Sequence, residues 1–172
     1  MKYIKYFIQF LFAILSFLIF KILGPSLSSK LSGKIFKLIG PFFRPKDIVH
    51  SNIKRGIPKI SSENLDKITN LMWSNYGNVF AEFMFLKSFR YGNLSSKIQV
   101  DGQDILDEIK KSNKQVIFIS GHFCNFELMA MYLEKTGINL ATIYRPLNNY
   151  FLNGFMERIR TKYICKYQIK KE

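Results

Sequence analysis

The side chains best placed to do chemistry are His122 and Glu127, which lie five residues apart in the stretch Gly121-His122-Phe123-Cys124-Asn125-Phe126-Glu127. An imidazole whose tautomer is fixed by a carboxylate can act as a general base. The spacing therefore predicts that His122 deprotonates a hydroxyl supplied by a substrate, while Glu127 orients the imidazole. A histidine that only satisfies structural hydrogen bonds is the alternative that spacing alone leaves open.

The two cysteines offer little further chemistry. Cys124 and Cys165 have no CxxC partner and no histidine at metal-ligand spacing, so we expect reduced thiols in the cytosol, no metal site and no cofactor. Cys124 could be proposed as a nucleophile, but it points elsewhere if His122 and Glu127 share a face.

The elements that would position His122 form a strand, helix, strand unit. Residues 115–119 are a continuous apolar run typical of a strand buried on both faces, residues 125–135 indicate a helix, and residues 139–144 indicate the next strand. Ligands of open parallel sheets bind at the carboxyl ends of the strands. His122 and Arg145, which each follow a predicted strand, are therefore expected at that edge.

Upstream, three shorter patterns predict further elements. A helix is expected to begin at Ser61 or Ser62, as its cap, and to continue to about residue 85, because its apolar positions keep a period of 3.6. Residues 98–100 indicate a short strand and residues 104–111 a helix, in which early acids and late lysines suit the helix dipole.

The N-terminal segment is apolar and carries no charge from Tyr6 to Phe20. Three interpretations compete: a cleaved signal peptide, a buried helix of a soluble domain, and an uncleaved membrane anchor. The first lacks a good cleavage site near Gly24-Pro25, and the second would leave aromatic side chains on every face. We therefore expect a single-pass anchor at residues 1–23, with Lys5 and Lys21 reaching towards the membrane surface.

Positive charge gathers beside this anchor. Residues 1–60 hold 11 Lys or Arg and one acid, a net +10 of the chain's +14. Residues 26–39 have the pattern of a basic amphipathic helix, after which prolines such as Pro41 are expected to break regular structure. The distribution predicts contact with anionic membrane lipids and a cytoplasmic location for the rest of the chain. Nucleic-acid binding is disfavoured, because the lysines follow an apolar span and not an exposed aromatic platform.

Around His122 the sequence resembles the bacterial lipid A biosynthesis acyltransferase family, the lauroyl and myristoyl transferases. The hallmark of that family is a histidine followed five positions later by an acid, in a setting like Gly-His-Phe-Gly-Asn-Trp-Glu. Here residues 121–127 fill that box, with Cys124 and Phe126 where Gly and Trp are usual. The likeness continues through the Arg145-Pro146 pair. Upstream, features in the family's order include the anchor, Asn52, a turn with Pro58, the stretch 73–77 and Glu82.

The resemblance implies a fold and a function. The fold would be α/β, glycerolipid-acyltransferase-like: a membrane anchor and amphipathic helices, followed by a partial parallel sheet with flanking helices. The enzyme would transfer a fatty acyl chain from acyl carrier protein to a hydroxyl of a lipid A precursor at the inner membrane. His122 and Glu127 would be catalytic, and Arg145 and Asn125 would bind substrate.

The chain departs from the family pattern after Arg160, because the later strands and an Asp-rich block are absent. We therefore expect a truncated chain, with domains at 1–23 (transmembrane anchor), 24–96 (basic helical region) and 97–172 (partial acyltransferase core), and a second polypeptide could supply the missing half. A non-catalytic membrane-bound remnant and a glycerolipid acyltransferase are the alternative functions.

Overall fold

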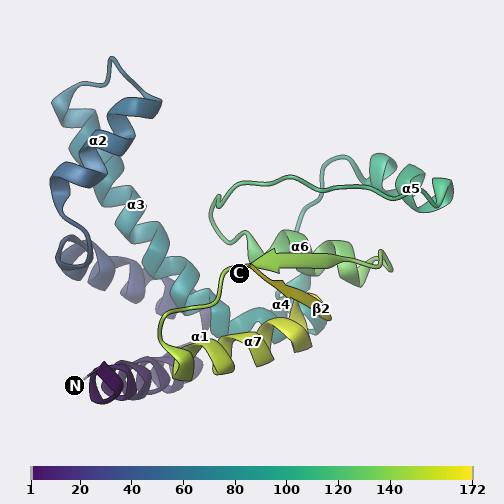
Figure 1. The fold of residues 1–172 in the computed structure, drawn as a ribbon, viewed down its shortest axis with the longest axis horizontal. Helices are drawn as coiled ribbons and strands as arrows, with labels where there is room; N and C mark the ends of the chain where they lie inside the picture. Colours follow the sequence, from purple (N-terminus) through teal and green to yellow (C-terminus); the bar gives the residue numbers. More distant parts are fainter. Residues whose placement is uncertain (1, 172) are drawn as a thin grey trace. The chain divides into compact units, whose positions relative to one another are not determined.

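The structure of the protein is a computed structural model that describes residues 2–171 (Figure 1). The fold is α/β and mostly helical, with a long apolar helix at the N-terminus and a small parallel sheet. The described chain divides into two compact units. One comprises residues 15–84, and the other comprises residues 2–14 together with residues 85–171.

Helix α1 (Lys2–Phe43) runs from the second unit into the first and changes direction at one glycine. Gly24 has φ 76° and ψ 170°, which lie outside the helical region, so two helical segments meet there. A residue with a Cβ rarely adopts such a positive φ, and Pro25 then begins the next segment with its fixed φ. The first helical segment of α1 thus ends at Gly24.

The unit of residues 15–84 packs the second segment of α1 against α3 (Ser62–Glu82), with α2 (Lys46–Gly56) beside α3. Small residues allow the backbones to approach closely, since a Cβ on Gly77 would collide with the Ser32 carbonyl. The 3₁₀ turn η1 (Phe83–Phe85) follows α3. Ser61 caps α3 by accepting a hydrogen bond from the Asn64 N–H at 3.3 Å, which confirms the predicted cap.

The other unit contains the parallel sheet. Strands β1 (Ala141–Tyr144) and β2 (Tyr167–Lys170) pair in parallel with Ala141 opposite Tyr167, and α7 (Tyr150–Tyr163) connects them. Around them lie four shorter helices, which are α4 (Leu86–Tyr91), η2 (Ser95–Lys97), α5 (Gln103–Ser112) and α6 (Glu127–Lys135).

The helices expected near 104–111 and 125–135 and the strand near 139–144 are confirmed, but two predicted strands are wrong. Residues 98–100 and 115–119 have no strand structure, and residues 113–126 form a long irregular connection between α5 and α6 (Figure 1). A strand exists only where a neighbour accepts its hydrogen bonds, and the neighbour of β1 is β2. The break expected at Pro41 is also wrong, because α1 continues to Phe43.

Candidate active site

His122 lies on the irregular segment that precedes α6, with its imidazole exposed to solvent. Its ring packs on Phe126, with 4.2 Å between the ring centroids. The backbone turns sharply here, because the Phe123 N–H donates to the Gly121 carbonyl at 2.9 Å and Cys124 adopts a φ of 45°. The imidazole is therefore accessible from solvent.

Glu127 is the first residue of α6 and is buried, with 7% of its surface exposed. The Arg160 guanidinium on α7 donates to Glu127 Oε1 twice, from Nε at 2.7 Å and from Nη2 at 2.5 Å. A buried carboxylate needs such a partner, and the helix N-terminus adds a favourable dipole. Glu127 and Arg160 belong to the same compact unit.

The structure does not join His122 to Glu127 by a hydrogen bond within residues 2–171, although it places them on one short segment. Both contacts from Arg160 go to Oε1. Neither contact involves the second carboxylate oxygen, Oε2. The predicted orientation of His122 by Glu127 remains a prediction.

The carboxyl end of β1 lies beside this ion pair. The Arg160 guanidinium carbon stands 5.9 Å from the ring centroid of Tyr144, the last residue of β1. Burial, together with the Glu157 carboxylate, raises the pKa of the Tyr144 hydroxyl above its ordinary 10.0. Arg145 follows directly and is exposed. The end of β1 and the start of α6 therefore both adjoin the ion pair. The prediction that His122 follows a strand is wrong, because residues 113–126 are irregular.

The remaining predicted site residue, Asn125, is half-buried, and its carbonyl accepts a hydrogen bond from the Leu128 N–H at 3.1 Å. Its neighbour Cys124 is exposed, whereas Cys165 is buried and donates from Sγ to the Leu140 carbonyl at 2.9 Å. Cys165 is thus a packing residue of the sheet region.

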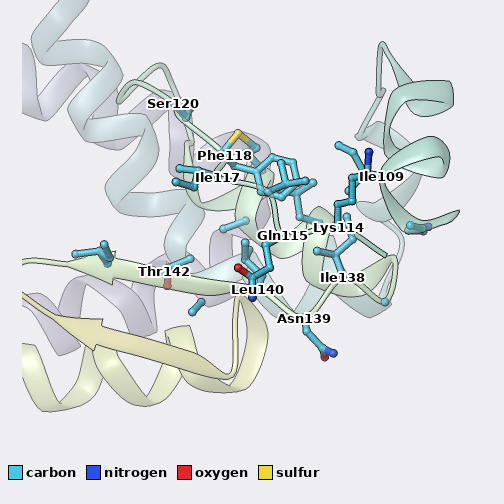
Figure 2. Close-up of a pocket in the computed structure, with 18 of the residues that line it drawn as sticks. Ile109, Lys114, Gln115, Ile117, Phe118, Ser120, Ile138, Asn139, Leu140 and Thr142 are labelled. Carbon is cyan, nitrogen blue, oxygen red and sulfur yellow. The ribbon is translucent and has the colours of Figure 1, made fainter. Parts of the chain in front are cut away.

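A cavity of about 1010 Å³ lies beside the site, between the 114–120 segment and the start of β1. Figure 2 shows Ile117 and Phe118 on one side and Leu140 and Thr142 on the other. Most of its lining is apolar, and Ser120, two residues before His122, lies at its margin. An apolar hollow of this kind suits a hydrocarbon chain.

Arg160 is the residue that the sequence did not single out. The rest of α6, strand β1 and most of α7 lie between it and Glu127 in the sequence, so no local spacing connects the two. Arg160 lies on a half-buried face of the 150–163 helix. An arginine in such a place needs an acidic partner, and this need was the signal that could have indicated the ion pair.

Comparison with known proteins gives one family. The sequence profile described as "Bacterial lipid A biosynthesis acyltransferase" matches residues 1–167. Neither the comparison with curated proteins nor the comparison with solved structures gave a match.

Proposed function

Because this chain belongs to the bacterial lipid A biosynthesis acyltransferase family, we propose that it transfers a fatty acyl chain from acyl carrier protein to a hydroxyl of a lipid A precursor. The family match supports a transferase of acyl groups in lipid A synthesis. The donor, the hydroxyl acceptor and the roles of individual residues are our proposal.

The observation that carries the proposal is the exposed His122 imidazole, five residues before a buried carboxylate that Arg160 holds in place. His122 takes the proton of the acceptor hydroxyl, and the hydroxyl oxygen attacks the thioester carbonyl carbon. The carbon–sulfur bond then breaks, and the leaving thiolate takes the proton from the imidazolium. Glu127 stabilises the imidazolium through Oε2 while Arg160 occupies Oε1.

Arg145 and Asn125 are the proposed substrate-binding residues. An exposed guanidinium at the end of β1 can form paired hydrogen bonds with a phosphate of the acceptor or stabilise the oxyanion. Asn125, between the proposed base and its acid, offers an amide to the same substrate. The apolar cavity beside Ser120 would take the acyl chain.

We place this reaction at the cytoplasmic face of the inner membrane. Helix α1 is long and apolar enough to anchor the chain in a membrane. The lysines that follow it would attract anionic lipids and the acidic carrier protein. In the proposed organisation, residues 1–23 anchor the chain, residues 24–96 form the basic helical region, and residues 97–172 carry the chemistry.

The test is acyl transfer from acyl carrier protein to a lipid A precursor, measured in membranes that contain the full chain. We expect His122→Ala to lower the rate by about 10²–10⁴-fold, the usual contribution of a positioned acid or base. Cys124→Ser is the matched control, because Cys124 is exposed on the same segment, and it should retain the wild-type rate.

The outcomes separate the alternatives. Consumption of lysophosphatidate in place of the lipid A precursor would assign a glycerolipid acyltransferase. Equal background rates for wild type and His122→Ala would leave a membrane-bound protein without catalysis and overturn the proposal.

A further inference from the structure

The second segment of α1, residues 25–43, packs its small residues against α3 within the unit that contains both. A Cβ on Gly33 would collide with the Asn78 side chain of α3, so the two helices approach closely here. Ser28 and Ser32 are buried beside it, at 0% and 1% exposure. The side of the segment that the protein covers is therefore made of serine and glycine.

A second side of the same segment is apolar and open, and we call it the apolar face. Leu27, Leu38 and Phe42 are 60%, 76% and 89% exposed. Successive members of this side are three or four residues apart, which is the spacing of one face of a helix. Its residues are Leu27, Leu31, Ile35, Leu38 and Phe42. The segment thus buries serines and leaves leucines open, which reverses the arrangement of a helix on the surface of a soluble protein.

Positive charge follows one margin of the apolar face. Lys30, Lys34 and Lys37 are exposed and recur at helical spacing, and we call them the lysine stripe. At about 100° per residue, the mean direction of the stripe lies about 90° from that of the apolar face. The segment contains no acid that could neutralise the stripe. A helix that lay flat with its apolar face in hydrocarbon would therefore hold the three ammonium groups at the level of lipid headgroups.

The apolar face begins directly after the stretch proposed as the membrane anchor. In the same unit, Leu18 and Ile22 are 57% and 85% exposed, and they belong to the apolar part of α1 that is able to enter a membrane. The break at Gly24 separates the two segments, so the second need not continue the direction of the first. A membrane that holds the anchor therefore lies beside the apolar face.

A membrane interface complements both features of the segment. Acyl chains of one leaflet cover an apolar face, and anionic headgroups attract lysines at its margin. A helix that crossed the bilayer would instead carry the lysine stripe through hydrocarbon, which is costly. The charge and the open leucines therefore favour a helix that lies in the membrane plane.

We propose that residues 25–43 lie in the plane of a membrane interface, with the apolar face in the acyl chains of one leaflet and the lysine stripe among anionic headgroups. The serine and glycine side packs on α3, which therefore stays outside the hydrocarbon. The sequence pattern predicts an amphipathic helix, and the packing on α3 assigns the side that meets lipid. This orientation builds on the proposed membrane anchor and is independent of the proposed acyl transfer.

The experiment measures the depth of single labelled cysteines in vesicles of phosphatidylethanolamine and phosphatidylglycerol. The full chain carries Cys124→Ser, since Cys165 is buried, and a fluorophore is attached at one introduced cysteine. Quenching by nitroxides at fixed depths in the lipid chains is then recorded. We expect equal, shallow depths for labels on the apolar face and no quenching for the label on α3. The apolar-face variants are Leu27→Cys, Leu31→Cys and Leu38→Cys, and the α3 variant is Lys67→Cys.

Each other outcome overturns the orientation. A crossing helix predicts that the Leu27→Cys and Leu38→Cys labels differ in depth by up to about 16 Å, because each residue advances about 1.5 Å along the axis. Unquenched labels on the apolar face would place it outside lipid, and a quenched Lys67→Cys label would place α3 inside. Leu15→Cys reports on the anchor separately, so that loss of the anchor is distinguished from a wrong orientation of residues 25–43.

The role of the lysine stripe is tested with two variants of equal charge that carry the Leu31→Cys label. One replaces the stripe, with Lys30→Gln, Lys34→Gln and Lys37→Gln. The control replaces three exposed lysines elsewhere in the same unit, with Lys54→Gln, Lys59→Gln and Lys67→Gln. In vesicles that contain phosphatidylglycerol we expect the stripe variant to lose more quenching than the control, and in phosphatidylcholine alone we expect no difference between them. Equal quenching of the two variants in phosphatidylglycerol would overturn the assignment of the stripe to the headgroups.

Discussion

Two ion pairs, one in each compact unit, illustrate how burial changes the meaning of the same contact. Glu127 and Arg160 join α6 to α7 with side chains 9% and 17% exposed, whereas Asp66 and Lys46 join α3 to α2 with side chains 53% and 60% exposed. Water screens the second pair and hardly reaches the first. The buried pair must be kept complete for the fold and holds a proposed catalytic group, while the exposed pair is a surface contact.

The largest expected effect comes from removing one member of the buried pair. Arg160→Met should lower the free energy of unfolding by about 3–5 kcal/mol, because Glu127 is left charged and buried without a partner. Thermal or denaturant unfolding of the purified chain in detergent measures this loss. Arg158→Met is the matched control, since Arg158 is exposed on the same helix, and it should change stability little. An equally small effect for both variants would mean that the pair is no more important than a surface contact.

The next effect, of about 1–3 kcal/mol, is the coupling between the two members. Glu127→Gln with Arg160→Met should be less destabilising than the sum of the two single changes, because no uncompensated charge remains. The double-mutant cycle measures this coupling, and acyl transfer is recorded for the same four proteins. We expect stability to recover in part while transfer stays low, since the proposed mechanism requires the Glu127 carboxylate. Strict additivity would contradict the coupling.

Asp66→Asn should have a smaller effect and change the free energy of unfolding by no more than the error of the experiment. Lys46 donates to Asp66 at 2.8 Å, but both side chains remain in water. Unfolding measured at low and high salt should show little difference between the wild type and the variant at either. A clear loss of stability at low salt would show that this exposed pair contributes more than its surroundings suggest.

The smallest effects concern pH, and the two regions should respond at opposite ends of the scale. The hydrogen bond and charge of Lys46 lower the pKa of Asp66 below its ordinary 3.8. The Asp66 carboxylate therefore stabilises the fold above pH 3.8, and this stabilisation is lost as pH falls through the lowered pKa. Because the pKa of Tyr144 is raised, its neutral hydroxyl stabilises the fold below pH 10.0, and this stabilisation is lost as pH rises through the raised pKa. Unfolding temperatures of wild type, Asp66→Asn and Tyr144→Phe, measured against pH, test both predictions. If Tyr144→Phe lost stability above pH 10.0 as the wild type does, the prediction for Tyr144 would be contradicted.

Local patterns predicted the helices well. The 3.6-residue period and the Ser61 cap gave α3 almost to its ends, because capping and amphipathic spacing are properties of neighbouring residues. The family followed from the box of residues 121–127, and the profile match over residues 1–167 confirms it. These features needed no knowledge of the tertiary fold.

Pairings between distant residues could not be predicted in the same way. The apolar run at 115–119 has the composition of a strand, yet β1 pairs with β2, whose residues 167–170 have no comparable apolar run. Arg160 is the partner of Glu127 only because the fold packs α7 against α6, and no local pattern indicates that packing.

The parallel pairing of β1 with β2 also sets an order of assembly. During synthesis β1 leaves the ribosome without its neighbour, because Ala141 pairs with Tyr167 and α7 lies between them. Closing a connection this short costs little entropy, so the pairing should follow soon after residue 170 emerges. Until then the edge of β1 is unprotected. Residues 141–144 therefore stay without their hydrogen-bonding neighbour until residues 167–170 have been synthesised.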